Sequence, residues 1–308
     1  MAFQQKTSSI SSVTKKLAID SVLTLREIKK KYKEFQLGGL DLTFPKGFIT
    51  GIIGPNGAGK STTIKIIMNM VKADSGKLSV FGLDYRKSEK EIKNRIGYVG
   101  EEQYFYSDKT VDWTGRFVSQ YYTNWDESYF RKLLSDFKLS PTKKTKELSK
   151  GMKVKLSLAL ALSHDPELII LDEPTAGLDP VVRRELLDLL MEIVEEEKRS
   201  VVISSHITDD ISRVADFVAF MIDGKIRIFS DKNELLSSWK KIHFKEDALD
   251  ADVKSGLFNL NESAFAGTGI ARDYSLIEDK IGRGLASGNI KISDVDLDDI
   301  LISYVKAE

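Results

Sequence analysis

Residues suited to phosphate chemistry are concentrated in one short stretch, GPNGAGKS at residues 54–61. The stretch follows an apolar run, FITGIIG, and opens a helical pattern, which is the context that identifies a phosphate-binding loop. Its glycines let consecutive backbone amides face phosphate oxygens, its lysine reaches the same oxygens, and its serine hydroxyl can ligate Mg²⁺. We therefore predict a nucleoside triphosphate site formed by Gly54, Pro55, Asn56, Gly57, Ala58, Gly59, Lys60, Ser61 and Thr62.

A second stretch, ELIILDEP at residues 167–174, ends an apolar run with two adjacent carboxylates. Such a run is typical of a central parallel strand, which places Asp172 at the carboxyl end, where α/β sheets bind ligands. Asp172 is expected to partner Mg²⁺, and Glu173 to accept a proton from, or orient, an attacking water. Whether the two side chains face the same way depends on where the strand ends. The alternative is that both simply end a strand.

The run SVVISSH, residues 200–206, is another apolar strand pattern that ends in polar side chains. Adjacent parallel strands end at the same edge of a sheet, so we expect His206 near Asp172, within reach of a γ-phosphate. An isolated histidine is more often an ordinary surface or core residue, and only its position after this strand favours a role in the site. A hydrolase pairing of Ser205 with His206 is disfavoured because no G-x-S-x-G motif is present.

The stretch KELSKGMKVKLSLALALSH, residues 146–164, begins as a polar turn and continues as an apolar helix pattern. Ser149 stands at the N-cap position, and the first-turn amides of such a helix, together with its dipole, favour an anion. Ser149, Lys150 and Gly151 therefore form a second candidate anion site. The alternative is that Ser149 only caps its own helix.

These motifs are positioned by an alternation of strand and helix patterns, which predicts an α/β fold. Residues 21–100 and 165–235 carry the alternation, and Asp179 with Pro180 forms an N-cap and N1 pair for a helix that follows. Between them, residues 104–160 are rich in aromatics and favour a helical insertion. Aromatics interleaved with lysines also occur where nucleic-acid bases stack, but packing of a small helical subdomain is the preferred interpretation.

Composition limits the class of protein. The chain has 308 residues and three histidines. It has no cysteine, which excludes disulfides and cysteine metal sites. Its 46 basic side chains equal its 46 acidic ones, and this balance argues against a nucleic-acid partner. Residues 1–20 form a polar leader without the apolar core of a signal peptide, and no run approaches a membrane span. From about residue 240 short strands, glycine turns and a final acidic-capped helix indicate a small α+β accessory domain, 240–308.

The ordered set of motifs resembles the ATPase subunit of ATP-binding cassette (ABC) transporters, over roughly residues 21–236. GPNGAGKST is similar to the Walker A sequence, LSKGM to the cassette signature, LIILDE to Walker B, AGLD at 176–179 to the D-loop and His206 to the switch histidine. Tyr32 falls where the family stacks an aromatic on adenine. Glu101 stands in the Q-loop segment IGYVGEE, where most members have glutamine.

The resemblance implies a P-loop NTPase core with a helical subdomain at about 104–160, and ATP hydrolysis with Mg²⁺. It implies that the catalytic residues are Glu173, His206 and Lys60. It implies that the Mg²⁺ ligands are Ser61, Glu101 and Asp172. The nucleotide would also be bound by Tyr32, Glu101, Ser149, Lys150, Gly151 and Asp179. Two identical chains would close head-to-tail over two ATPs. A separate transmembrane permease would hold them at the cytoplasmic face of the membrane, in a system similar to bacterial exporters of peptides and antibiotics.

Two departures and one alternative stay open. Lys150 replaces the glycine that is more usual in the signature, and Glu101 brings a negative charge toward Glu173. A chromosome cassette ATPase is disfavoured because the segment between GPNGAGKS and LSKGM is too short for a coiled coil, and a translation factor because only one cassette is present. An ATP-dependent regulatory switch without a membrane partner remains possible.

Overall fold

The computed structural model of the chain describes residues 20–306 except 198, 247 and 264. It divides into two compact units, Met1–Phe229 and Ser230–Glu308. The polar leader expected at residues 1–20 lies, apart from Asp20, outside the described residues.

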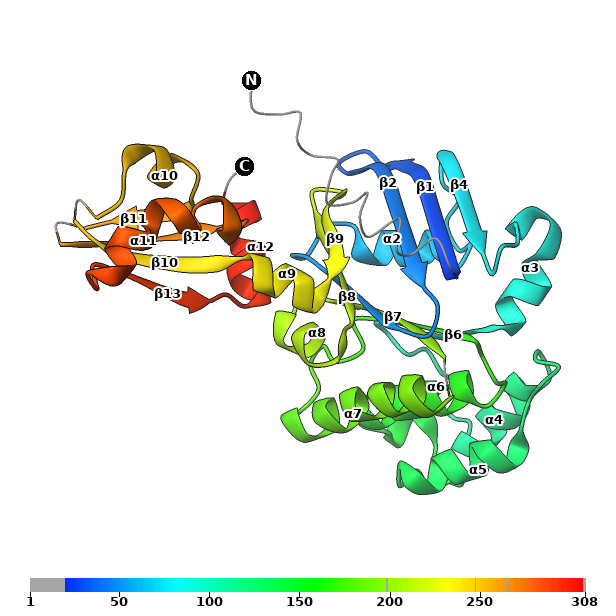
Figure 1. Cartoon of the computed structure of the whole chain (residues 1–308). Coiled ribbons are helices and arrows are strands. Elements are labelled where there is room, and N and C mark those ends of the chain that lie inside the picture. The colour runs from blue at the N-terminus through cyan, green and yellow to red at the C-terminus, as the bar shows by residue number, and fades with distance from the viewer. Residues whose placement is uncertain (1–19, 198, 247, 264, 307–308) are drawn as a thin grey trace. The chain divides into compact units, whose positions relative to one another are not determined.

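The larger unit is built around a six-stranded sheet with the order β5-β6-β7-β3-β8-β9 (Figure 1). Its strands are β3 (Ile49–Ile53), β5 (Ile96–Val99), β6 (Leu168–Asp172), β7 (Ser200–Ser205), β8 (Phe217–Ile222) and β9 (Lys225–Asp231). The strands from β5 to β8 run parallel, and every residue of β3, β6, β7 and β8 is buried. Continuous apolar runs such as LIILD suit strands that are covered on both faces. Because Asp172 pairs with Ser204 and Ile53 with Ser205, the ends of β6, β7 and β3 lie at one edge.

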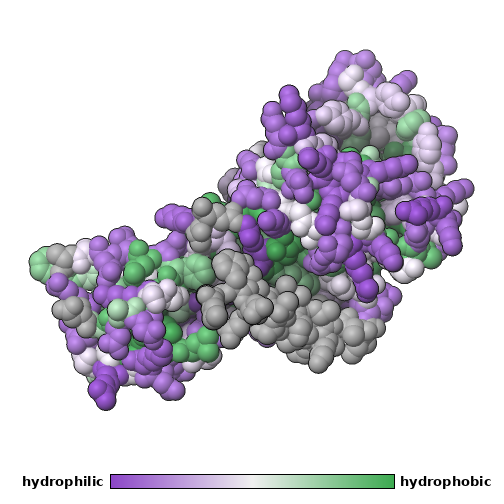
Figure 2. All heavy atoms as spheres, turned by 90° about the horizontal axis from the view of Figure 1, so that it is seen from above, coloured by the Kyte–Doolittle hydropathy of each residue, from purple (hydrophilic) through white to green (hydrophobic). Residues whose placement is uncertain are grey.

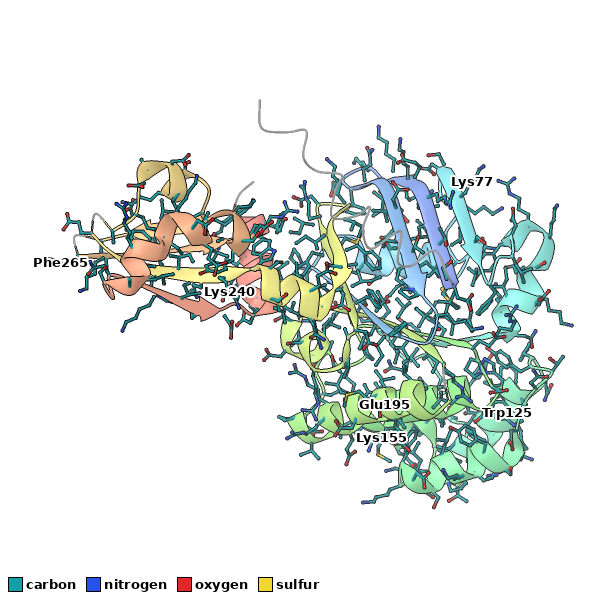
Figure 3. The ribbon with its side chains drawn as sticks, in the orientation of Figure 1. Lys77, Trp125, Lys155, Glu195, Lys240 and Phe265 are labelled. Carbon is teal, nitrogen blue, oxygen red and sulfur yellow. The ribbon has the colours of Figure 1, made fainter. Side chains whose placement is uncertain are left out.

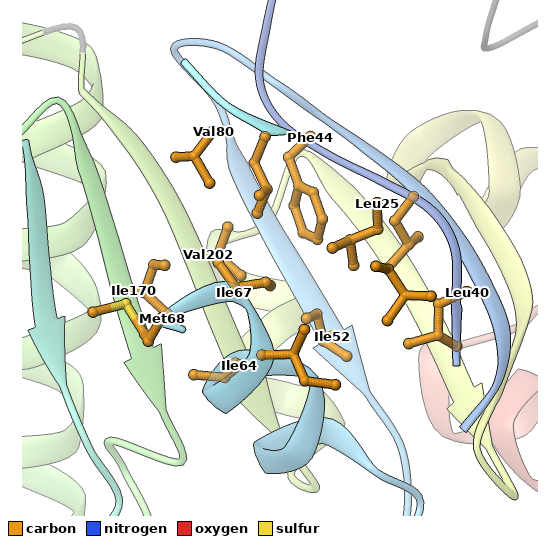
Figure 4. Packing of buried hydrophobic residues seen from close by; sticks show 14 of the residues in the cluster. Leu25, Leu40, Phe44, Ile52, Ile64, Ile67, Met68, Val80, Ile170 and Val202 are labelled. Atoms are coloured by element: carbon orange, nitrogen blue, oxygen red, sulfur yellow. The ribbon is translucent and has the colours of Figure 1, made fainter. Parts of the chain in front are cut away.

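A second, antiparallel sheet of order β2-β1-β4 contributes to the same core. Its strands are β1 (Ser21–Lys31), β2 (Gln36–Pro45) and β4 (Ser75–Val80). Helix α2 (Lys60–Ile67) packs Ile64 and Ile67 between the two sheets, where Figure 4 also shows Ile52, Phe44, Leu25, Leu40, Val80, Ile170 and Val202. The apolar face of this helix is thus explained by burial between the sheets, and the burial fixes the position of its amino end.

The described helices of the larger unit include several that begin at side-chain caps, whereas Gly59 before α2 and Ile207 before α8 (Thr208–Val214) provide no such cap. Besides α2 and α8 they are α3 (Tyr85–Asn94), α4 (Val111–Ser119), α5 (Glu127–Asp136), the 3₁₀ turn η1 (Thr145–Glu147), α6 (Lys150–Leu162) and α7 (Pro180–Glu197). Thr110 caps α4, Asp126 caps α5 and Ser149 caps α6 by accepting hydrogen bonds from backbone amides. Trp125, labelled in Figure 3, packs against Phe130 of α5 with ring centroids 5.2 Å apart. Lys155 of α6 pairs with Glu185 of α7 at 2.6 Å.

The smaller unit is an antiparallel sheet of order β11-β12-β10-β13 with its own apolar core. Its elements are α9 (Lys232–Ser238), β10 (Lys240–Lys245), α10 (Ala251–Ser255), β11 (Phe258–Glu262), β12 (Ala266–Ala271), η2 (Tyr274–Leu276), α11 (Glu278–Ala286), β13 (Ile290–Asp294) and α12 (Leu297–Val305). From β10 to β13 the order β-α-β-β-α-β is that of the ferredoxin-like split βαβ motif. Asp296 caps α12, as the acidic start of that segment indicates.

The exposed surface is mostly hydrophilic in the view of Figure 2, where hydrophobic residues form small separate patches. Within the described part of the chain, none of the helices has both the length and the hydrophobicity needed to cross a bilayer.

Candidate functional site

The loop between β3 and α2 has the backbone that its glycines permit. Gly57 has φ +83° and Gly59 has φ +107°, which side chains rarely allow. A Cβ atom at Gly59 would also stand 2.7 Å from the side chains of Phe35 and Leu37. Gly59 is the N-cap of α2 and provides no side-chain cap, so the first amides of the helix are left for another acceptor. The predicted phosphate-binding loop therefore has a backbone that suits an anion.

Lys60, the first residue of α2, lies in a buried network. Its ammonium donates to the carbonyl oxygens of Gly54 at 2.7 Å and Pro55 at 3.2 Å and pairs with Glu173 Oε1 at 3.0 Å. Lys60 and Glu173 are 5% and 7% exposed. The loop lysine and the predicted catalytic carboxylate are thus in direct contact.

The backbone of Glu173 answers the question of which way its side chain faces. Strand β6 ends at Asp172, and Glu173 has φ +49°, a left-handed conformation that costs energy in a non-glycine residue. The resulting turn brings its carboxylate to the same edge of the sheet as Asp172. Glu173 Oε2 lies 2.7 Å from Nδ1 of His206 and also accepts from the His206 backbone amide at 3.3 Å. One carboxylate is therefore held between Lys60 and His206.

Two of the three proposed magnesium ligands, Ser61 and Asp172, are in direct contact. Ser61 Oγ donates to Asp172 Oδ1 at 3.0 Å, and Ser204 Oγ donates to the same oxygen at 2.7 Å. A hydroxyl and a carboxylate oxygen are ligands that a hard cation such as Mg²⁺ takes. The described residues contain no group of three or more His, Cys, Asp or Glu side chains suited to a metal by themselves. The donor set fits Mg²⁺ that takes its remaining ligands from phosphate and water.

The signature residues lie apart from this cluster. Ser149 caps α6 by accepting from the Met152 amide at 3.3 Å, and both Ser149 and Lys150 are exposed. No hydrogen bond or ion pair between described residues joins residues 149–151 to Lys60, Asp172 or Glu173. A single chain therefore brings together the phosphate-binding loop, the two carboxylates and His206. The amino end of α6, with Ser149 and Lys150, is exposed to solvent.

The segment that follows the turn at Glu173 leads to α7. Gly177 has φ +68°, and the ammonium of Lys150 stands 3.0 Å from the position that a Cβ there would take. Asp179 caps α7 by accepting from the amides of Val181 and Val182, each at 3.1 Å, as the pattern Asp179-Pro180 predicts. The carboxylate of Asp179 is therefore engaged with its own helix, and its assignment to the nucleotide site stays a prediction.

An aromatic pair lies beside the loop. Tyr32 is 42% exposed and stacks on Phe35 with ring centroids 6.5 Å apart, while the Phe35 ring also reaches Gly59. An exposed aromatic face next to the loop is suited to stack on a planar base. Tyr32 was expected here, whereas Phe35 was not identified from the sequence.

The comparisons with known proteins agree with this geometry. The family model described as ABC transporter matches residues 37–176, and one described as AAA domain, putative AbiEii toxin, Type IV TA system, matches residues 145–208. The chain is 34% identical over 241 residues to the ABC transporter ATP-binding protein YtrB of Bacillus subtilis, covering 78% of this chain and 81% of that protein. This chain belongs to the ATP-binding cassette family. It is an ATP-binding and ATP-hydrolysing subunit of an ABC transporter.

Two further matches each cover roughly two thirds of this chain. The lantibiotic transport ATP-binding protein SrtF of Streptococcus pyogenes is 36% identical over 208 residues, which is 67% of this chain and 89% of that protein. The solved structure of cbiO1 from Clostridium perfringens, described as part of the ABC transporter complex cbiONQ, has a TM-score of 0.62 at 27% identity, covering 71% and 91% of the two chains. These matches favour the transporter subunit over a regulatory switch ATPase.

The Q-loop segment of this cassette approaches the metal ligands through Tyr98. Burial raises the pKa of the Tyr98 hydroxyl to about 12, and the negative charges of Asp172 and Glu101 add to the effect. Tyr98 therefore stays neutral at any working pH and lies within the field of both carboxylates. Glu101 itself is exposed, and its role as a metal ligand stays a prediction.

Ser204, which the sequence patterns did not indicate, connects Asp172 with the backbone of Glu173. Besides donating to Asp172, its hydroxyl oxygen accepts from the backbone amide of Glu173 at 3.0 Å, and the residue is fully buried. The signal lay in the strand register, since Ser204 pairs with Asp172 across β6 and β7. A serine two positions before His206 does not by itself indicate this contact.

Proposed function

We propose that this cassette subunit binds ATP with Mg²⁺ on its phosphate-binding loop and completes the site with Ser149 of a second copy, so that two chains close head-to-tail over two nucleotides. One observation supports the proposal: the Glu173 carboxylate lies between Lys60 and His206, while Ser149 and Lys150 at the amino end of α6 are exposed in the same chain. An exposed helix amino end is suited to bind a phosphate that is held by a second chain.

Each residue has a role in hydrolysis that its contacts support. Glu173 accepts a proton from the attacking water, and His206, hydrogen-bonded to that carboxylate, orients it toward the γ-phosphate. Lys60 and the amides of the loop stabilise charge on the phosphate oxygens. Ser61 and Asp172, with Glu101 as a further predicted ligand, would hold Mg²⁺, which would neutralise phosphate charge. Tyr32 stacks on the base.

The composite site follows from the physics of α6. Its first-turn amides, the Ser149 hydroxyl and the helix dipole favour an anion, and the Lys150 ammonium adds positive charge. A γ-phosphate bound by both chains stabilises the closed pair only by its greater affinity for that state, so hydrolysis allows the pair to open. ATP binding and hydrolysis thereby drive a cycle of closure and opening.

An aromatic patch suits a transmembrane partner. We define it as Tyr104, Tyr106, Trp113, Phe117 and Tyr121. Its three tyrosines are 85%, 62% and 66% exposed in that order, and the Trp113 and Phe117 rings stack at 5.1 Å. The rings of Tyr106, Trp113, Phe117 and Tyr121 contact one another, and exposed Tyr104 precedes them in the sequence. Exposed aromatics of this kind suit a protein contact. A short cytoplasmic helix of a permease docked there would hold the subunit at the cytoplasmic face of the membrane.

The transported substrate is proposed from relatives. SrtF is named for lantibiotic transport, which supports export of a peptide, antibiotic or other amphipathic compound. The competing function is a regulatory switch without a membrane partner. Only the transporter subunit requires the aromatic patch for association with the membrane.

The test is fractionation of cells that express the full chain. The wild-type chain should sediment with membranes, and a Tyr104→Ser, Tyr121→Ser variant should leave them while it keeps its affinity for ATP. Phe265→Ser, which removes an aromatic that is 83% exposed in the smaller unit, is the control and should stay on membranes. A wild-type chain absent from membranes would support the regulatory switch, and a double variant retained on them would exclude the patch as the docking surface.

A further inference from the structure

The first turn of α8 contains a buried carboxylate that the roles above do not use. Asp210 is 1% exposed and stands four residues after His206. Its Oδ2 accepts a hydrogen bond from the Thr175 hydroxyl at 2.6 Å, and its Oδ1 pairs with the Arg183 guanidinium. A buried carboxylate is costly unless it is fully paired, so these partners are the reason that position 210 can be charged.

Asp210 and its two partners come from three segments that converge on the proposed hydrolysis site. Thr175, also 1% exposed, is two residues after Glu173. Arg183 lies in the first turn of α7, directly after the segment of Gly177 and Asp179. Asp210 lies on α8, the helix that follows His206 (Figure 1). One side chain therefore connects the turn of Glu173, the start of α7 and the segment of His206.

The turn of Glu173 needs such restraint because its backbone is left-handed, with φ +49°. A non-glycine residue keeps this conformation only where its surroundings enforce it. On one side the Glu173 amide is held by Ser204 at 3.0 Å. On the other side, two residues later, Thr175 is held by Asp210. The pair of restraints sets where the Glu173 carboxylate meets His206.

We infer that Asp210 is a positioning residue for ATP hydrolysis, which acts through Thr175 on the turn of Glu173 and through Arg183 on the start of α7. The inference rests on the proposed role of Glu173. Asp210 has no hydrogen bond to the described residues of the phosphate-binding loop, so its removal should lower kcat and leave nucleotide affinity unchanged. A misplaced carboxylate lowers turnover by about 10- to 100-fold.

Thr175→Val is the sharpest variant, because it removes only the hydroxyl and keeps the pair of Asp210 with Arg183. Asp210→Asn tests the charge, and Thr175→Ser should restore turnover because it restores the donor. The matched control is Asp188→Asn, since Asp188 pairs with Arg213 at 2.8 Å across the same two helices, α7 and α8, at the surface. Urea unfolding of each variant, followed by circular dichroism, establishes that it is folded under the assay conditions.

Steady-state ATPase assays and titration with a non-hydrolysable ATP analogue give kcat and affinity separately. The inference predicts a kcat at least about tenfold lower for Thr175→Val and Asp210→Asn, with unchanged analogue affinity, recovery in Thr175→Ser and wild-type kcat in Asp188→Asn. Wild-type kcat in folded Thr175→Val would overturn it, as would an equal loss in Asp188→Asn. Glu173→Gln, assayed beside them, separates the role of Asp210 from the role of Glu173. If Glu173→Gln keeps its turnover, the proposed catalytic role of Glu173 is wrong, whatever Thr175→Val and Asp210→Asn show.

Discussion

Replacing Glu173 by glutamine tests two consequences of its position at once. The change keeps the shape of the side chain and removes the charge that Lys60 meets at 3.0 Å and His206 at 2.7 Å. Loss of a general base lowers turnover by about 10²- to 10⁴-fold, which is about 3 to 5 kcal/mol on the barrier. ATP hydrolysis should therefore nearly cease.

The same change should tighten nucleotide binding. A carboxylate and an ammonium 3.0 Å apart attract by about 5 kcal/mol at an effective dielectric constant of about 20, before desolvation offsets most of that value. Lys60 must exchange this partner for phosphate when ATP binds, and the carboxylate also repels the phosphate. We expect affinity to rise about tenfold, which is about 1.4 kcal/mol.

Calorimetric titration and a steady-state assay measure the two effects. Glu167→Gln is the control, since Glu167 precedes the same strand, β6, and pairs with Arg95 at the surface, where such pairs contribute about 0 to 1 kcal/mol. It should keep normal turnover and affinity. Turnover of Glu173→Gln within about twofold of wild type would refute its role as the base. Weaker nucleotide binding by the folded variant would refute the competition between Glu173 and phosphate for Lys60.

Three other substitutions probe the loop, the composite site and a buried histidine. Lys60→Ala should weaken ATP binding in calorimetry, whereas Lys65→Ala, on the exposed side of the same helix, should not; equal affinities for both would count against the loop assignment. Ser149→Arg should keep ATP binding and lose cooperative turnover, because bulk and charge enter the mouth of α6; cooperative turnover that persists would contradict the shared site. Burial lowers the pKa of His164 below its unfolded value of 6.5. As the pH drops below about 6.5, the unfolded chain therefore binds a proton at this residue before the folded chain does. The free energy of unfolding then falls by up to about 1.4 kcal/mol per pH unit. Urea unfolding at about pH 7.5 and 5.5 should show a smaller fall for His164→Gln than for wild type, and an equal fall would exclude His164 as its source.

Local patterns in the sequence predict much of the candidate site. Glycine spacing predicts the phosphate-binding loop, and polar residues at helix starts predict the caps at Ser149 and Asp179, because these features depend only on neighbouring residues. The run LIILD predicts a buried parallel strand with Asp172 at its end, and the structure has β6 there. The family resemblance adds roles that the spacing alone does not supply.

Other features depend on contacts between distant segments. The left-handed backbone of Glu173 decides where its carboxylate points, and nothing in ELIILDEP indicates that conformation. Ser204 and Asp210 are ordinary polar residues in sequence and become informative only when the register of β7 with β6 and the packing of α8 near Thr175 are known. The strand order of the smaller unit likewise follows from long-range pairing, such as that of β10 with both β12 and β13.

The central claim is that one nucleotide is held by two copies of this chain. The most direct measurement is the mass of Glu173→Gln in solution by light scattering, with and without ATP and Mg²⁺. The chain of 34.6 kDa should double its mass when the nucleotide is present, and adding Ser149→Arg to the same variant should abolish the doubling. A mass that stays at 34.6 kDa with saturating nucleotide would contradict it.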